Sequence, residues 1–209
     1  IVPQGLCALY ASGRTTGVVV DSGEGVTTVT PVFDSFLLDH ATHRINVGGK
    51  DVSAHLKRVL FEQGLNFSAA GDALTLREIK ESLGYVAEDY EDELTQDAKE
   101  ETFELPDGTD ITVGKERFRC TEVLFNPNIT NTEVMSFPDV VATSIKACGI
   151  DTRRQLSSNV VLSGGNTLFD GFDRRLQDEL GKQFPGLFGS VSVMAAPDRK
   201  YNVWAGASV

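Results

Sequence analysis

Cysteine, basic residues and long apolar runs are all scarce in this sequence. Only three cysteines occur among 209 residues, Cys7, Cys120 and Cys148, and their odd number and wide spacing fit neither a disulfide framework nor a zinc site. We therefore expect reduced thiols and an intracellular protein. Lys and Arg number 19 against 30 Asp and Glu, for a net charge of −11. Direct binding to nucleic acid is not expected, because the phosphate backbone would be repelled.

No apolar run approaches the roughly 18 residues of a membrane-spanning helix, and the first residues lack the pattern of a secretory signal. We therefore expect no membrane insertion. Hydrophobic residues make up 41% of the chain, which is enough for the core of one large or two small domains. The sequence begins without Met, and both of its ends lie in apolar segments, 6–10 and 204–209. These ends predict a piece of a longer protein.

The most informative segment is 18–29, in which two β-rich runs join through a Gly-x-Gly turn that follows Asp21. We expect Gly23 and Gly25 to take positive φ, with the N–H groups of the turn facing an anion. Asp21 would supply an oxygen ligand for Mg²⁺ through water. An ordinary hairpin with an acidic turn has the same pattern, so this segment alone leaves both interpretations open.

A second glycine loop, 163–167, follows a short apolar strand at 159–162 and precedes a helix built on Phe172, Leu176 and Leu180. Strand, glycine turn and helix N-terminus form an arrangement in which the backbone approaches a nucleotide closely. A plain strand-to-helix connection is the alternative. Two such loops in one chain favour a nucleotide.

The rest of the pattern predicts a mixture of strands and helices. A helix from about Asp72 buries apolar residues and leaves Arg77, Lys80 and Glu81 on its polar side, where solvated surface is their ordinary role. Acidic residues dominate 88–104 without the spacing of a Ca²⁺ loop, which predicts a solvated helix end and loop. The other expected elements are strands at 17–21, 26–33 and 41–47, helices at 51–63 and 138–149, and a hairpin at 102–113 around a Pro-Asp-Gly turn.

Six segments occur in the order and form of one family, and together they are long and specific. They are residues 9–17, 21–27, 104–108, 116–120, 163–165 and 199–204. On these segments the chain closely resembles actin and the actin-related proteins over nearly its whole length. The resemblance implies the α/β actin-like ATPase fold, which is ribonuclease H-like, with only the second half of it present.

The same resemblance implies a division into two subdomains. The inner one comprises 1–47 and 133–209, with a short stub of the other lobe at 1–10, and is like actin subdomain 3. The outer one, 48–132, is an inserted α+β subdomain like actin subdomain 4. The half of an actin that carries the first phosphate loop has no counterpart in this sequence.

The resemblance also implies ATP or ADP and Mg²⁺ as cofactors. Asp21 would hold Mg²⁺ through water, and Gln4 stands where the family orients the attacking water. The residues that match nucleotide-binding positions of the family are Asp21, Ser22, Gly23, Glu24, Gly25, Val26, Gly49, Arg77, Lys80, Glu81, Gly164, Gly165, Asn166, Leu168, Phe169 and Lys200.

Three departures from the family pattern indicate a divergent member. Thr28 stands where the family has a histidine near the hydrolytic water, and a hydroxyl cannot take the protonation roles of imidazole near neutral pH. At most slow ATP hydrolysis is therefore expected. Glu24 replaces the usual Asp in the turn, and the polar segment 128–132 replaces a largely apolar plug between opposing strands.

Three functions remain open from the sequence. The first is an ATP-binding cytoskeletal protein that forms filaments or associates with them. The second is a structural actin-related subunit of a dynactin, branching or chromatin-remodelling complex with little ATP turnover. A sugar kinase or Hsp70-type ATPase is remote, because segments 10–17 and 199–204 argue against it. Expected partners are the chain itself, other actin-family subunits and actin-binding proteins, in the cytoplasm and cytoskeleton, or in the nucleus for an actin-related protein.

Overall fold

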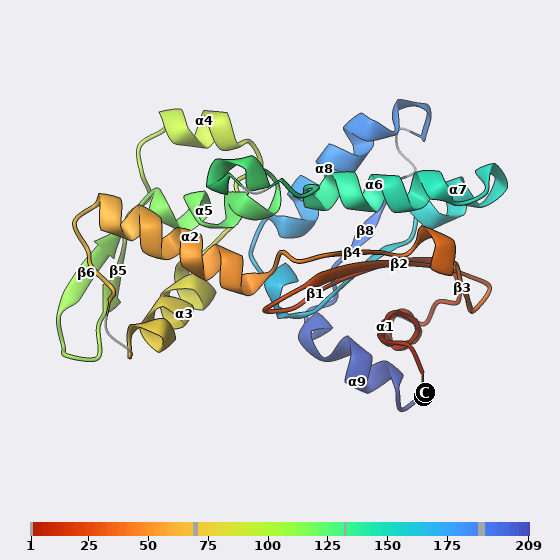
Figure 1. Ribbon diagram of the computed structural model, residues 1–209, viewed down its shortest axis with the longest axis horizontal. Helices are drawn as coiled ribbons and strands as arrows, with labels where there is room; N and C mark the ends of the chain where they lie inside the picture. The colour runs from red at the N-terminus through yellow and green to blue at the C-terminus, as the bar shows by residue number, and fades with distance from the viewer. Residues whose placement is uncertain (1, 69–70, 132, 188–190) are drawn as a thin grey trace.

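A mixed six-stranded sheet forms the centre of the molecule (Figure 1). The computed structural model describes residues 2–68, 71–131, 133–187 and 191–209. The strand order is β3-β2-β1-β7-β8, and β4 also pairs with β2. The strands are β1 Gly17–Ser22, β2 Thr27–Phe33, β3 Phe36–Leu37, β4 His43–Ile45, β7 Val160–Ser163 and β8 Val193–Met194.

The register of the central strands brings the two glycine loops to one edge of the sheet. β1 runs antiparallel to β2 and parallel to β7, so that Asp21 pairs with both Thr28 and Ser163. Val18, Val19 and Val20 are fully buried, as expected for a β-branched run covered on both faces. The turn after β1 and the loop after β7 therefore leave the sheet side by side.

Helices cover both faces of the sheet (Figure 1). On one face, α1 (Gln4–Ala11) and α9 (Asn202–Gly206) pack together over a small core that includes Leu9 and Val19. On the other face lie α6 (Phe137–Ala147), α7 (Ile150–Ser157) and α8 (Phe172–Gln183), over the main core. The cysteines of the sequence are free and buried, in agreement with the reduced thiols that were expected.

The segment from residue 49 to 131 forms a second group of elements beyond one end of the sheet, at the left of Figure 1. It contains α2 (Gly49–Glu62), α3 (Asp72–Leu83), α4 (Tyr90–Thr95), α5 (Glu116–Arg119) and the hairpin β5 (Glu101–Glu104) and β6 (Asp110–Val113). Short 3-10 helices are η1 Asp39–Ala41, η2 Thr121–Leu124, η3 Pro127–Thr130, η4 Gly165–Thr167, η5 Pro185–Leu187 and η6 Arg199–Tyr201.

Most of the predicted elements are present, and one strand is shorter than predicted. The helix at 51–63 and the hairpin at 102–113 are confirmed as α2 and β5–β6. The predicted strand at 41–47 is wrong in part, because only His43–Ile45 pairs with β2. Its first residues close the 3-10 helix η1 instead, with hydrogen bonds from Ala41 N to Leu38 O and from Thr42 N to Asp39 O.

A buried ion pair joins the outer elements to α8. The Arg175 Nη2–Glu122 Oε1 distance is 3.4 Å, and only 11% and 5% of the two side chains are exposed. Arg175 also donates to Ala87 O, pairs with Glu179 and lies over the ring of Phe125. Burial raises the pKa of Glu122 to about 7, although the neighbouring guanidinium opposes this rise.

We expect the Glu122→Gln variant to remove a specific pH dependence of stability. Because the folded-state pKa of Glu122 lies above its ordinary value of 4.5, the folded protein holds the proton more tightly than the unfolded chain. This contribution to stability is complete below about pH 4.5 and is lost as the pH rises through 7. Urea unfolding at pH 5 to 8 should show the wild type losing on the order of 2 kcal/mol relative to the variant.

The Glu179→Gln variant is the control, because it removes the more exposed carboxylate beside the same guanidinium. Its stability should still fall between pH 5 and 8, because burial of Glu122 is the main cause of the raised pKa and the charge of Glu179 is a minor one. If the free energy of unfolding changed with pH in the same way in wild type and in Glu122→Gln, this would contradict the raised pKa of Glu122 in the folded protein.

Candidate functional site

A cavity of about 500 Å³ lies between α3 and the two glycine loops at the sheet edge. Five separate stretches of the chain contribute to its wall: the turn after β1, the start of α2, the second half of α3, the loop at residues 165–170, and the segment at residue 200. The lining residues are Gly23, Glu24, Gly49, Arg77, Lys80, Glu81, Ser82, Gly84, Gly165, Asn166, Leu168, Phe169, Asp170 and Lys200.

The turn after β1 is fixed by its carbonyl groups. Gly23 N donates to Val26 O and closes the turn, while Gly23 O and Glu24 O accept hydrogen bonds from the N–H groups of Gly49 and Lys50 at 3.0 and 2.8 Å. These carbonyls satisfy N–H groups in the first turn of α2 that have no partner within the helix. The turn and α2 are therefore held together directly.

The expectation of positive φ at Gly23 and Gly25 is wrong. Among the described residues, the glycines with positive φ are Gly13, Gly64, Gly108, Gly164 and Gly171. The turn needs no left-handed residue, because its carbonyls point to α2. Outside this bonding, no described residue accepts a hydrogen bond from the N–H groups of Glu24, Gly25 or Val26, which leaves three consecutive donors for an anion.

Gly48 and Gly49 permit the close approach of α2 to the turn. A Cβ atom on Gly48 would lie 2.6 Å from Gly23 O and 2.8 Å from Glu24 O. A Cβ atom on Gly49 would overlap the Glu24 carboxylate and lie 3.2 Å from Lys80 Nζ. A side chain at Gly48 would push the helix away from the turn, whereas one at Gly49 would displace the Glu24 carboxylate.

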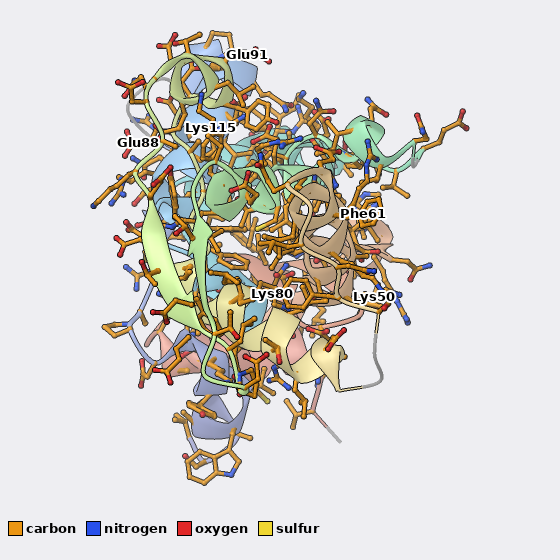
Figure 2. The ribbon with its side chains drawn as sticks, turned by 90° about the vertical axis from the view of Figure 1, so that its left-hand side faces the viewer. Lys50, Phe61, Lys80, Glu88, Glu91 and Lys115 are labelled. Atoms are coloured by element: carbon orange, nitrogen blue, oxygen red, sulfur yellow. The ribbon has the colours of Figure 1, made fainter. Side chains whose placement is uncertain are left out.

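Lys80 places a buried positive charge at the cavity. Only 4% of its side chain is exposed, and its ammonium donates to Gly49 O at 3.0 Å and lies 3.4 Å from Glu24 Oε2. The interpretation of Lys80 as solvated surface is therefore wrong, because α3 turns this side chain inward (Figure 2). Glu24 is 67% exposed, so its carboxylate stands at the opening.

Arg77 and Glu81 form an exposed ion pair on the same side of α3. Arg77 Nε donates to Glu81 Oε1 at 2.8 Å, one helical turn along. This hydrogen bond raises the pKa of Arg77 and lowers the pKa of Glu81. Both groups therefore remain charged at the rim of the cavity near neutral pH.

The second glycine loop packs directly against β1. Gly164 has φ of +87°, and a Cβ atom there would overlap Ser22 O and lie 2.9 Å from Asp21 Oδ1. Asn166 Nδ2 donates to Ser22 Oγ at 3.0 Å, and Ser22 Oγ shares a hydrogen bond with Thr27 Oγ1. The Oδ1 atom of Asn166 is buried and has no partner among the described residues. Asn166 Oδ1 can therefore accept a hydrogen bond from a ligand.

A family model described as Actin matches residues 1–209, the full length of the chain. The chain belongs to the actin family. Its mixed α/β architecture with a mixed sheet fits an actin-like fold. In the described residues of this actin-family chain, no helix is both long and apolar enough to cross a membrane.

The actin-family site predicted from the sequence coincides with the cavity in most of its residues. Lining it are Gly23, Glu24, Gly49, Arg77, Lys80, Glu81, Gly165, Asn166, Leu168, Phe169 and Lys200. Beside it, but not lining it, are Asp21, Ser22, Gly25, Val26 and Gly164, which belong to the strand end and the two loops.

Asp21, Thr28 and Gln4 lie away from the cavity wall. Thr28 is the direct cross-strand neighbour of Asp21. Partial burial raises the pKa of Asp21, and the Ser163 hydroxyl opposes part of this rise. Gln4 is exposed at the start of α1 and does not line the cavity. Its neighbour Gly5 packs against Thr30, two residues beyond Thr28 on β2. The structure therefore brings Thr28 to Asp21, and Gln4 lies at the exposed start of α1.

Three residues that line this cavity, and one that fixes the second glycine loop, were not predicted from the sequence. Ser82, Gly84 and Asp170 line the cavity, and a Cβ atom on Gly84 would lie 2.9 Å from the Phe169 ring. Arg199 is buried, and its guanidinium donates to Thr167 O at 2.8 Å, which fixes the second glycine loop. The spacing of one helical turn from Lys80 could have indicated Gly84. Arg199 was noted in the sequence only as the neighbour of Lys200.

Proposed function

We propose that this actin-family chain binds ATP or ADP with Mg²⁺ in the cavity between α3 and the two glycine loops. The observation that carries the proposal is the convergence of widely separated segments on one cavity of about 500 Å³. Two of these segments, the turn after β1 and the loop after β7, have glycine motifs that are consistent with a nucleotide site. The volume lies within the range of small-molecule and cofactor sites.

The residues present fit a nucleotide. The unpaired N–H groups of Glu24, Gly25 and Val26 and the buried ammonium of Lys80 suit phosphate oxygens. Leu168 and Phe169 offer apolar surface to a base, and the unpartnered Oδ1 of Asn166 offers an acceptor. Asp21 would hold Mg²⁺ through water at the edge of the sheet. When bound, the nucleotide supplies a phosphate chain whose shortening changes the contacts made to the protein.

We further propose that the cavity separates an inner subdomain, 1–47 with 133–209, from an outer subdomain, 48–132. Thr132, at the end of the proposed outer subdomain, and Ile1 lie outside the described residues. The support for this division is that the sheet and its covering helices come from the first set of residues, and α2 to α5 and the hairpin from the second. A cavity between two such units suits a ligand that holds them together.

The role of the bound nucleotide follows from the family and from one residue. Assembly with copies of itself, with other actin-family subunits or with actin-binding proteins is the proposed activity, in the cytoplasm and cytoskeleton. Thr28 beside Asp21 favours the second candidate, a structural subunit with little ATP turnover in a cytoplasmic or nuclear complex, because a hydroxyl replaces a titratable imidazole next to the proposed metal ligand.

The test is the dependence of nucleotide binding on Asp21. We expect the Asp21→Asn variant of the protein that carries this sequence to bind Mg-ATP about 100-fold more weakly than wild type, because the metal loses its anionic partner. ATP in excess EDTA should bind both proteins alike. Isothermal titration calorimetry measures both affinities.

The Asp178→Asn variant is the matched control, because it makes the same change at an exposed site on α8. Its affinity for Mg-ATP should equal that of wild type. Equal affinities of Asp21→Asn and wild type for Mg-ATP would overturn the metal assignment, and no binding by the wild type would overturn the proposed function.

A further inference from the structure

A second cavity, of about 760 Å³, lies in the outer group of elements and shares no lining residue with the first. Its wall includes Asp110, Ile111 and Thr112 of β6, Tyr90 and Leu94 of α4, and Glu100 just before β5. Three consecutive residues of one strand line it. Because alternate side chains of a strand point to opposite faces, three consecutive residues share a wall only where the strand edge itself forms that wall.

The edge of β6 that borders this cavity has unpaired backbone groups. Among the strands that the structure describes, β6 pairs with β5 alone, in a two-stranded sheet. Leu105 N donates to Thr109 O, and alternation along an antiparallel ladder then makes Phe103 and Ile111 the next hydrogen-bonded pair. The N–H and C=O groups of Asp110 and Thr112 therefore point away from β5, and no described residue bonds to them there.

The surroundings of this edge are strongly acidic. Residues 88–110 contain eleven Asp and Glu against Lys99 alone, a balance of −10 in a chain whose net charge is −11. Nearly the whole excess negative charge of the protein is thus concentrated in α4 and the hairpin. Figure 2 shows Glu88 and Glu91 of this segment above the hairpin. Such a field attracts cations to this face of the molecule.

Two of the three carboxylates that line the cavity have no partner among the described residues, whereas Glu116 accepts a hydrogen bond from Gly114 N. Within the described part of the chain, Glu100 and Asp110 have no ion pair or side-chain hydrogen bond. The two cationic side chains of the wall are already engaged, because Lys115 Nζ donates to Leu94 O and Arg119 Nη2 donates to Glu62, both at 2.7 Å. A ligand there would meet two free carboxylates beside an open strand edge.

We propose that the β6 edge binds an extended, lysine- or arginine-rich segment of a partner protein as a third strand. Backbone groups of Asp110 and Thr112 would pair with the segment, and its basic side chains would face Glu100 and Asp110. The cavity provides room for side chains on the inner face of the added strand. Long open edges are otherwise a liability, and the negative charge favours a basic partner over a second copy of this acidic chain.

The probe is an acetylated, amidated heptapeptide that alternates lysine with threonine, titrated into the protein that carries this sequence. We expect saturable binding by fluorescence anisotropy at low salt and slower amide hydrogen exchange at Asp110 and Thr112. The same peptide methylated on alternate backbone nitrogens should bind at least about tenfold more weakly, since it cannot complete the ladder. A glutamate-threonine analogue should not bind.

Two double variants that each remove two negative charges distinguish the carboxylates that line the cavity from the overall negative charge of residues 88–110. Glu100→Gln with Asp110→Asn should weaken peptide binding about tenfold, and Asp97→Asn with Glu104→Gln, outside the cavity wall, by less than about threefold. Equal losses in the two double variants, or equal binding of the methylated peptide, would overturn strand addition. So would dimerisation of the protein through the β6 edge in the absence of peptide.

Discussion

Replacing Gly164 with alanine is expected to destabilise the folded protein by about 3 kcal/mol or more. The residue has φ of +87° and ψ of 152°, a conformation that costs an L-residue roughly 1–3 kcal/mol, and the added methyl group would overlap Ser22 O of the neighbouring strand. The strand and the loop must then separate. Urea or thermal unfolding measures the loss, and each kcal/mol should lower the melting temperature by about 2–4 °C.

Gly165→Ala is the control for this prediction, because it inserts the same methyl group one residue later. A Cβ atom there meets only the Lys200 side chain, at 3.9 to 4.0 Å, and Gly165 does not have positive φ. Its stability should change by less than about 1 kcal/mol. Similar losses in the two variants would show that the close packing of the loop on β1 is not what requires glycine at position 164.

Replacing Lys80 with methionine is expected to lower the affinity for ATP about 100-fold. The ammonium is the buried cation at the cavity, and charge-assisted hydrogen bonds in such surroundings are stronger than those at an exposed surface. Methionine fills a similar volume without the charge. Binding of a fluorescent ATP analogue, with circular dichroism to verify the fold, measures the effect.

Lys50→Met is the matched control, since Lys50 is the neighbour of Gly49 but its side chain is exposed and does not line the cavity (Figure 2). We expect its affinity to change by less than about threefold. Lys80→Gln separates charge from folding, because the amide still has a donor for Gly49 O. Wild-type affinity in Lys80→Gln would contradict an electrostatic role for Lys80.

The two glycine loops and the polar face of α3 could be predicted because their signals are local. Glycine at the end of a strand predicts a loop, whatever the position of that strand in the fold. Which glycine takes positive φ is not local. Gly164 does so because its loop crosses β1, whereas Gly23 does not, because the carbonyls of its turn bond to α2.

The remaining parts of the cavity depend on packing between distant segments. The burial of Lys80 results from the contact of α3 with α2, and a helical pattern marks it only as a polar residue. Arg199 fixes a loop more than thirty residues earlier through backbone carbonyls, which have no sequence signature. The cavity beside β6 is enclosed by residues that follow α2 and by parts of α4, α5 and the hairpin, so no single segment could predict it.

The hydrogen bonds between the β1 turn and the first residues of α2 attach one end of that helix to the turn. α2 has 14 residues and is therefore about 21 Å long. A rotation of about 5° at the turn displaces its far end by about 2 Å. That end carries Glu62, which holds Arg119 at the wall of the second cavity. A rotation of α2 at the turn would therefore reach the wall of the second cavity through the ion pair of Glu62 with Arg119.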